Sequence, residues 1–390
     1  MKQRLLALLL AAGLVLSMAA CGDPASDSSS APSADPSSTS SEEIVADLTQ
    51  DLLPFAAGME ASDTALTVNG QEVPADLFLY WLALNCAYFQ QNYGLPLDGS
   101  YGNAVLQDSL TMTAYYVIME QKVLEEGCPL TDEQRSEIQA EMVADGQETY
   151  DNRKLLFNLT DETMEFIYSV SDYYDNLLHT LTSAPTQDEL NQYVYQAKHI
   201  LLLTVDMDGT PTVQDGAYVY PSLDEETIAE KKALADDLLA QLRSSDDPEA
   251  LFDELMNEYS EDTGLESNPD GYTTTVGQMV PAFEETALSL EFGEISDVVE
   301  SSYGYHIILR GEVEDLDSYA DQYRQSLLDA RIDQWLEDAE VTPVETIENL
   351  DVANFYNRYN AWQTAMAEQL QADSDSDASA SPAQSGSAEE

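Results

Sequence analysis

Positive charge is scarce in this chain of 390 residues. Lys and Arg together number 14, against 74 Asp and Glu, so the formal net charge is −60. Proteins bind nucleic acid largely through basic side chains that neutralise phosphates. This composition therefore excludes nucleic acid as a partner, and it argues equally against docking on anionic lipid headgroups.

The acidic excess has two interpretations. It would enrich basic partners or divalent cations near the surface, or it is a solvated surface adapted to its surroundings that does no chemistry. None of the acidic stretches has the residue spacing of a Ca²⁺-binding loop. We therefore predict neither a metal site nor a cofactor.

Cysteine is equally rare. Only Cys21, Cys86 and Cys128 occur, so no disulfide framework of the kind found in small secreted domains holds the chain together. Cys86 and Cys128 could form one bond, but their spacing does not decide whether they do. The chain is long enough for two or three domains of ordinary size.

The N-terminus is typical of a secretion signal. Met1–Arg4 is basic, and Leu5–Leu16 is an apolar run too short to span a bilayer as a mature helix. The stretch Met18–Cys21 is similar to the lipobox of bacterial lipoproteins, although Met18 stands where that motif usually has Leu. The resemblance implies a signal peptide over 1–20 and a lipid anchor on Cys21, at the extracytoplasmic face of the cell membrane. The alternative is an ordinary signal peptide followed by a chance cysteine.

Two segments lack the apolar residues that a folded core needs. Residues 21–62 are rich in Ser, Asp and Pro, with few large apolar side chains before Ile44, and residues 372–390 are a similar Ser, Asp and Ala tract. Burial in such segments cannot offset the entropy that is lost on ordering. We predict a disordered tether over 21–62, with order beginning at Glu42 at the earliest, and a disordered acidic tail over 372–390.

Residues 63–194 are expected to be mainly helical. Ala65–Pro74 predicts two short strands joined by a tight turn at Asn69 and Gly70. Apolar spacing and capping signals then predict helices over 75–89, over 103–126, from Thr131 onward, and over 161–181, the last with His179 at a core-like position. The first of these helices is expected to present its apolar residues on one face, namely Leu77, Tyr80, Trp81 and Leu84.

The next segment mixes strands and helices. Thr186 begins a capping box for a short helix, and Gln196–Leu203 predicts a strand by its branched and apolar content. On that strand His199 shares a face with Ala197 and Leu201. The pattern then predicts helices over 224–242 and 248–259, a long loop, a helix that begins at residue 281, and a strand over 304–309.

Three separated motifs in this segment resemble the parvulin-type peptidyl-prolyl cis/trans isomerases. They are KHILL from Lys198, GQMVPAFEETALSLEFGEIS from Gly277 and YGYHIILR from Tyr303, in the family's order. The preceding helical layout, with the stretch VNG at 68–70, is similar to extracytoplasmic foldases of the PrsA and SurA type. The resemblance implies an α+β fold: a parvulin-like antiparallel sheet with surrounding helices over 195–312, inserted into a mainly α-helical chaperone-like domain formed by 63–194 and 313–371.

The resemblance also implies a site. His199 and His306 match the family's two central histidines, and Asp262 matches its Cys-or-Asp position beside the prolyl bond. Met279 and Phe283 match the floor and wall of the proline pocket. Rotation about an X–Pro bond must overcome a barrier of about 18–20 kcal/mol. It needs an apolar cup and fixed polar groups, but neither a nucleophile nor a cofactor. The histidines are expected to fix the shape of the site or to be purely structural, rather than to transfer protons.

The loop at Pro269–Thr275 departs from the family pattern. Parvulins usually have Gly-Asp-Leu-Gly here and then an aromatic residue, whereas in this chain only Asp270 matches and Thr274 takes the aromatic position. Tyr272 could supply a substrate-binding ring from a shifted position. Without such a ring the pocket would be open on one side and catalysis would be weak. The loop after Leu203 lacks the basic residues that some parvulins use for phosphorylated substrates.

The sequence leaves three functions open. The resemblance implies a membrane-anchored extracytoplasmic foldase that isomerises X–Pro bonds in unfolded or partly folded secreted proteins. One alternative is a non-catalytic holdase chaperone with a degenerate parvulin domain, which the altered loop favours. The other is a ligand-binding surface lipoprotein, which no specific motif favours.

Overall fold

The computed structural model describes residues 44–214 and 217–380. The chain divides into two compact units, of which the first joins the chain up to Leu181 with the chain from Leu328 on, and the second is Thr182–Leu327. The predicted signal peptide, Cys21 and the first part of the predicted tether lie outside the described residues. Among those that are described, no helix combines the length and the apolar content that a bilayer span requires.

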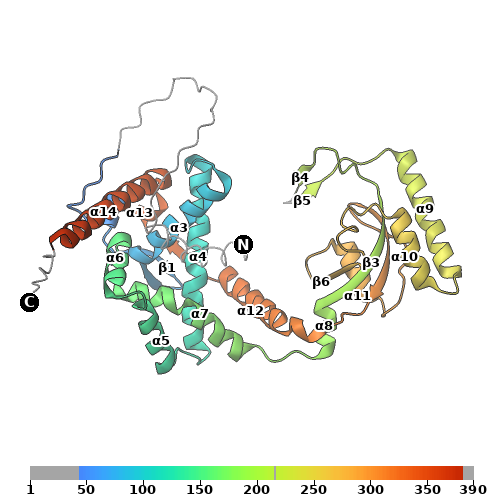
Figure 1. Ribbon diagram of the computed structural model, residues 1–390, viewed down its shortest axis with the longest axis horizontal. Coiled ribbons are helices and arrows are strands. Elements are labelled where there is room, and N and C mark those ends of the chain that lie inside the picture. Colours follow the sequence, from blue (N-terminus) through green and yellow to red (C-terminus); the bar gives the residue numbers. More distant parts are fainter. Residues whose placement is uncertain (1–43, 215–216, 381–390) are drawn as a thin grey trace, which may run out of the picture. The chain divides into compact units, whose positions relative to one another are not determined.

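The first unit is mainly helical (Figure 1). A small antiparallel sheet, with strand order β2-β1-β9, consists of β1 (Thr64–Val68), β2 (Gln71–Pro74) and β9 (Val341–Pro343). The predicted tight turn is present, since Asn69 and Gly70 both have positive φ, at 52° and 80°. The helices are α2 (Leu52–Ala57), α3 (Ala75–Tyr93), α4 (Gly99–Glu125), α5 (Asp132–Met142), α6 (Gln147–Phe157), α7 (Asp161–Leu181), α12 (Ala320–Glu337, which starts in the second unit), α13 (Glu345–Glu348) and α14 (Val352–Ala380).

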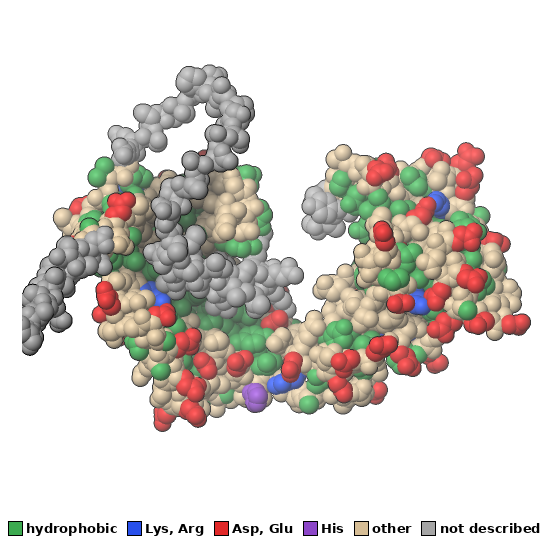
Figure 2. Space-filling model, in the orientation of Figure 1, with side chains coloured by type: hydrophobic (Ala, Val, Ile, Leu, Met, Phe, Trp, Pro, Cys, Tyr) green, Lys and Arg blue, Asp and Glu red, His purple; other side chains and the backbone are tan. Residues whose placement is uncertain are grey.

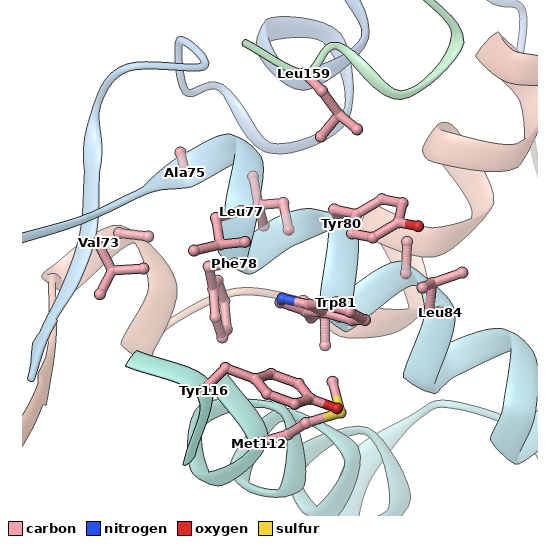
Figure 3. Close-up of a cluster of buried hydrophobic side chains, with 14 of the residues drawn as sticks. Val73, Ala75, Leu77, Phe78, Tyr80, Trp81, Leu84, Met112, Tyr116 and Leu159 are labelled. Carbon is pink, nitrogen blue, oxygen red and sulfur yellow. The ribbon is translucent and has the colours of Figure 1, made fainter. Parts of the chain in front are cut away.

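Helix α3 is the centre of this unit's core. Every residue from Ala75 to Cys86 is buried, so the prediction of a single apolar face is wrong. The reason is that α3 has helical neighbours on more than one side, among them α2, α4 and α14. Figure 3 shows the ring of Trp81 between α3 and α4, and its centroid lies 5.1 Å from that of Tyr116. The buried carboxylate of Asp76 accepts hydrogen bonds from the backbone and hydroxyl of Thr160, both at 2.8 Å.

Ordered structure begins before residue 63, in the part of the predicted tether where order from Glu42 onward was allowed. Residues 44–62 were expected in the tether, but Leu53 and Phe55 of α2 are buried in the first unit's core. Helix α14 contacts α2 and holds it in two further ways. The Nε of Arg358 donates to the carbonyl of Phe55 at 2.7 Å, and the indole Nε1 of Trp362 donates to the carbonyl of Gln50 at 3.0 Å. At its other end α14 continues to Ala380, beyond the expected limit at residue 371.

The second unit is an α+β structure, as predicted. Its four-stranded antiparallel sheet has the strand order β6-β3-β8-β7, and a separate hairpin lies in the predicted loop after Leu203. The elements are α8 (Gln187–Tyr193), β3 (Val194–Leu203), β4 (Thr212–Gln214), β5 (Ala217–Val219), α9 (Glu225–Ser244), α10 (Pro248–Tyr259), β6 (Tyr272–Thr275), α11 (Pro281–Ser289), β7 (Val299–Glu300), β8 (Gly304–Gly311) and the 3₁₀ turn η1 (Leu316–Tyr319).

The two faces of this sheet differ in what covers them. Ile200 and Leu202 of β3 pack with residues of α9 and α10, while Tyr195 and Ala197 pack with Phe283 of α11. Because side chains alternate along a strand, His199 lies on the α11 face. The pairing of β3 with β8 sets Leu201 opposite His306, which places the second histidine on the same face.

Acidic side chains are spread over the visible surface, and Lys and Arg are few (Figure 2). In the second unit the cations are largely matched with carboxylates: Lys198 lies 2.7 Å from Asp253, and Lys231 forms an ion pair with Glu261. The acidic excess therefore appears as a distributed surface charge. The third histidine, His179, was predicted in the core but is exposed at the end of α7.

Candidate functional site

Two histidines from neighbouring strands meet in the second unit. The rings of His199 on β3 and His306 on β8 are stacked, with centroids 5.3 Å apart and planes 17° apart. Their Nδ1 atoms lie 3.1 Å from each other. Both side chains are largely buried, so this contact is a hydrogen bond in which one ring donates and the other accepts.

Asp262 closes one end of the histidine pair. Its Oδ2 lies 2.9 Å from the Nε2 of His199 and accepts a hydrogen bond from the hydroxyl of Tyr272 at 2.6 Å, while its Oδ1 accepts from the backbone N–H of Gly264 at 2.9 Å. Burial by itself would raise the pKa of this carboxyl. The hydrogen bonds from His199, Tyr272 and Gly264 outweigh burial and hold the pKa of Asp262 well below its usual range. Asp262 is therefore an ionised, acceptor-only group.

Ser301 closes the other end. Its Oγ lies 2.7 Å from the Nε2 of His306 and accepts the backbone N–H of Tyr303 at 3.1 Å. Burial, reinforced by the neighbouring His199, lowers the pKa of His306 to about 3, so its ring is neutral at ordinary pH.

These contacts join Asp262, His199, His306 and Ser301 into one line of hydrogen bonds. Asp262 can only accept, so the Nε2 of His199 carries a hydrogen. The two Nδ1 atoms share one hydrogen, and the Nε2 of His306 is hydrogen-bonded to the hydroxyl of Ser301. Each ring nitrogen has one partner. The four side chains thus form a satisfied chain of hydrogen bonds, the kind of network that fixes side-chain positions.

A cavity of about 380 Å³ opens beside this chain. Phe283 stands on edge to both histidines, with its ring centroid 5.2 Å from that of His199 and 5.7 Å from that of His306. The cavity therefore combines apolar and polar surface. Its lining residues are His199, Leu201, Leu203, Met207, Glu261, Asp262, Thr263, Tyr272, Gln278, Met279, Val280, Phe283, Tyr303 and His306.

Every predicted site residue of this unit lines that one cavity. The structure brings together the five side chains that the motif match proposed, and it adds Tyr272, whose ring centroid lies 5.8 Å from that of His199. Tyr272 is the first residue of β6, a strand that the sequence pattern did not predict. Thr274, which takes the family's aromatic position, is not among the lining residues. The predicted lipid anchor, Cys21, lies outside the described residues.

Sequence reasoning missed several residues of the site. Leu203 could have been found, because alternation along β3 places it on the face of His199 and Leu201. Ser301 had no comparable signal. It precedes β8 in a turn, and its role depends on the reach of its hydroxyl to the far nitrogen of His306.

Comparison with known proteins identifies this part of the chain. Residues 199–312 match the family model "Rotamase: PPIC-type PPIASE domain". The foldase protein PrsA of Halalkalibacterium halodurans is 45% identical over 83 residues, which are 21% of this chain and 24% of that protein. The chaperone SurA of Chromohalobacter salexigens is 36% identical over 115 residues, which are 27% of this chain and 25% of that protein.

Among solved structures, the chain is similar to a crystal structure of peptidylprolyl isomerase (PrsA) from Bacillus cereus. The TM-score is 0.36 at 18% identity, and the alignment covers 78% of this chain and 99% of that one. The sequence matches to the two curated relatives are shorter and span only about a quarter of each. The predicted recognition of a parvulin-type domain is confirmed.

Proposed function

Because residues 199–312 form a parvulin-type rotamase domain, we propose that this chain is a foldase that isomerises X–Pro bonds in secreted proteins. The observation that supports the proposal most is the cavity of about 380 Å³, in which Met279 and Phe283 adjoin the chain of Asp262, His199 and His306. Its volume lies in the range of small-ligand pockets and leaves room for a proline ring with its flanking peptide groups.

The proposed chemistry follows from this surface. The planar X–Pro amide resists rotation by about 18–20 kcal/mol, and an enzyme lowers that barrier when it binds the twisted amide better than either planar form. Phe283, Met279 and Leu201 supply an apolar seat that immobilises the ring. Asp262 and His199 supply polar groups that are already held in place, so they need not reorganise as the amide twists.

The ring of Tyr272 favours catalysis over a purely passive binding role. The altered loop predicted an opening in the pocket unless Tyr272 filled it, and Tyr272 does line the cavity. Its hydroxyl bond to Asp262 fixes the ring. Because Tyr272 fills this side of the pocket, the altered loop no longer favours a non-catalytic holdase over an isomerase.

The charge of the cavity limits the clients. Among the residues that the structure describes, its lining includes Glu261 and Asp262 but neither Lys nor Arg, and Glu261 already pairs with Lys231. A phosphorylated or acidic residue before the proline would meet carboxylates there. We therefore propose that the site prefers clients in which the residue before the proline is neutral or basic.

The location of the activity is the second part of the proposal. The lipobox-like stretch Met18–Cys21 supports attachment through a lipid on Cys21, at the extracytoplasmic face of the membrane where secreted proteins emerge. Metabolic labelling with a radioactive fatty acid should label the wild type and spare Cys21→Ser. Equal labelling of the two chains would reject the anchor.

The experiment that tests the activity is peptide exchange. The whole chain from residue 22 is added to a short peptide with one X–Pro bond, and the cis-to-trans exchange rate is followed by NMR. Uncatalysed exchange takes tens to hundreds of seconds, so acceleration is easily measured. A rate equal to that in buffer would reject the isomerase and leave the holdase. Suppression of client aggregation, or its lack, would then separate the holdase from the ligand-binding lipoprotein.

A further inference from the structure

Strand β6 is an edge strand of the second unit's sheet, next to the cavity. On its inner side it pairs with β3, from Thr275 opposite Val194 to Tyr272 opposite Ala197. No strand lies on its outer side within residues 44–214 and 217–380, and Figure 1 shows β6 at the margin of the sheet. The outer backbone groups of β6 are therefore in position to pair with another extended chain.

The register tells which residues face inward. The N–H of Val276, the next residue after β6, donates to the carbonyl of Tyr193 at 2.8 Å. In an antiparallel pair, such directly bonded positions recur at every second residue. Thr274 and Tyr272 are the next two, so their N–H and C=O groups point to β3.

Thr273 and Thr275 occupy the alternate positions, and their N–H and C=O groups point to the outer edge. The described part of the chain offers no hydrogen-bond partner to these four groups. Thr273 is exposed, whereas Thr275 is 9% exposed. The accessible part of the edge is thus centred on Thr273.

This edge, although only four residues long, lacks the other features that normally prevent pairing. Exposed edge strands are usually protected by charged side chains, proline, bulges or short length. Residues 271–283 contain no charged side chain, although 23% of the chain is charged, and β6 has neither a proline nor a break in register. The opposite edge strand, β7, is two residues long and contains Glu300. Of the two edges of this sheet, only β6 is left open.

The open edge is continuous with the cavity. Tyr272 is both the first residue of β6 and part of the cavity lining. Strands in a sheet lie about 4.8 Å apart, so a strand added outside β6 would lie about 10 Å from β3, the strand of His199. Three or four extended residues, at about 3.3 Å each, cover that distance. One peptide can therefore reach the cavity and the edge together.

We propose that the client segment next to the isomerised proline adds to the outer edge of β6 as an extended strand, centred on Thr273. The inference rests on the proposed isomerase and names how it holds its substrate. Pairing of this kind uses backbone groups, so it tolerates varied client sequences. The acidic surroundings and the uncharged edge favour segments that are neutral or basic.

The first test uses three peptides with the whole chain. Each peptide has one Lys–Pro bond. The first is four residues long. The other two have the same six-residue uncharged extension, in which every second amide is N-methylated; the amides methylated in one peptide are those left free in the other. Only alternate N–H groups of a paired strand face its neighbour. One phase should therefore bind about tenfold tighter than the other, which corresponds to one or two lost hydrogen bonds. Hydrogen exchange should slow at the Thr273 amide when the favoured peptide binds.

The second test removes one donor of the edge. Thr273→Pro deletes an outward N–H and no bond to β3, a substitution that edge strands accept, whereas Thr273→Val keeps the backbone and the strand shape. Thr273→Pro should raise KM for the extended peptide about fivefold and leave its kcat unchanged. The kinetic constants for the four-residue peptide should not change. Thr273→Val should match the wild type with both peptides.

Each other outcome has a definite meaning. Equal affinity of the two phases, with no protection at Thr273, would overturn the edge site while leaving the isomerase intact. No turnover of any peptide would reject the isomerase, and protection of Thr273 would then still report strand addition. The Thr273 amide could also become protected without peptide, to a degree that rises with protein concentration. That result would show that a second copy of this chain pairs with the edge, and it would reject the client as the occupant.

Discussion

The Nδ1 atoms of His199 and His306 lie 3.1 Å apart, in a pair of stacked and buried rings. At that distance only one hydrogen fits between them, and two imidazolium rings would repel each other. The pair is therefore held by the groups at its ends, Asp262 and Ser301. Protonation of His306 would require both of its ring nitrogens to donate, the Nδ1 to His199 and the Nε2 to Ser301.

Acid should weaken the fold through His306. Its pKa is lowered to about 3 in the folded chain, against about 6.5 when unfolded, so the unfolded state binds the proton first. This part of the stability is complete above pH 6.5 and is lost as pH falls towards 3. Between pH 6.5 and 4.5 the loss should reach about 2–3 kcal/mol. Urea titrations of wild type and His306→Gln over this range measure it, since the variant should have the shallower pH dependence.

The exposed His179 in the first unit provides the matched control. His179→Gln should keep the full pH dependence of the wild type, because His179 is exposed at the end of α7 and belongs to the other unit from His306. Equal pH dependence in wild type and His306→Gln would show that His306 is not the group responsible.

Met279→Ala should reduce turnover without unfolding the chain. Met279 lines the cavity and is only partly buried, so its loss removes apolar contact with the proline ring at about 0.8 kcal/mol for each methylene. We expect kcat/KM for a short X–Pro peptide to fall about tenfold. Leu124→Ala, at a side chain 65% exposed in the first unit, should leave the rate unchanged. A tenfold loss in both variants would point to general damage.

Tyr272→Phe and Tyr272→Ala should separate two roles of one side chain. The phenylalanine variant keeps the ring in the cavity lining but removes the hydroxyl donor to Asp262, so the pKa of Asp262 should rise towards its ordinary value. The alanine variant also opens the lining and should lose more activity, by a further factor of about ten. Carboxyl ¹³C titration and kcat/KM measure the two effects. Equal activity of the two variants would show that the ring of Tyr272 does not contribute to substrate binding.

Leu53→Ala should destabilise the first unit alone. Leu53 has no exposed surface, and such a deletion costs about 2–5 kcal/mol. Tryptophan fluorescence reports this unit specifically, because Trp81, Trp335 and Trp362 all lie in it. Urea unfolding followed at the tryptophans should shift, while peptide exchange persists. A change in the free energy of unfolding below about 0.5 kcal/mol, the level of a surface substitution, would show that α2 does not belong to the core of the first unit.

The thiol of Cys86 should be inert. Burial raises its pKa to about 12, so little thiolate is present at pH 8, whereas Cys128 is only partly buried and both are free. Iodoacetamide followed by mass spectrometry should modify Cys128 well before Cys86 in the native chain, and both at similar rates in urea. Protection of both cysteines that is removed by a reductant would indicate a disulfide instead.

Local chemistry was enough to predict part of the fold. Thr131 and Thr186 each begin a helix with both hydrogen bonds of a capping box, and the turn at Asn69 and Gly70 joins β1 to β2. Each of these signals is contained within about four residues. The histidine-bearing strands followed from the longer motifs KHILL and YGYHIILR, and the α+β class followed from the family resemblance that these motifs support.

Features that depend on distant partners were missed. Strand β9 is three residues long and is defined only by its pairing with β1, more than 270 residues away. Strand β6 likewise has β3 as its partner, and without it Tyr272 could not be placed in the cavity. Helix α2 was hidden because its polar neighbours dominate the composition around it, while its burial depends on Arg358 and Trp362 of α14.

The nesting of Thr182–Leu327 between the two parts of the first unit has a consequence for biosynthesis. A chain that emerges from its N-terminus presents all of the second unit before Leu328, Ile332 and Trp362, which the first unit's core requires. The second unit therefore has its complete sequence earlier. Part of the apolar surface of helices α3 to α7 therefore stays uncovered until α12 and α14 have been made, so the first unit's core is completed only after the second unit.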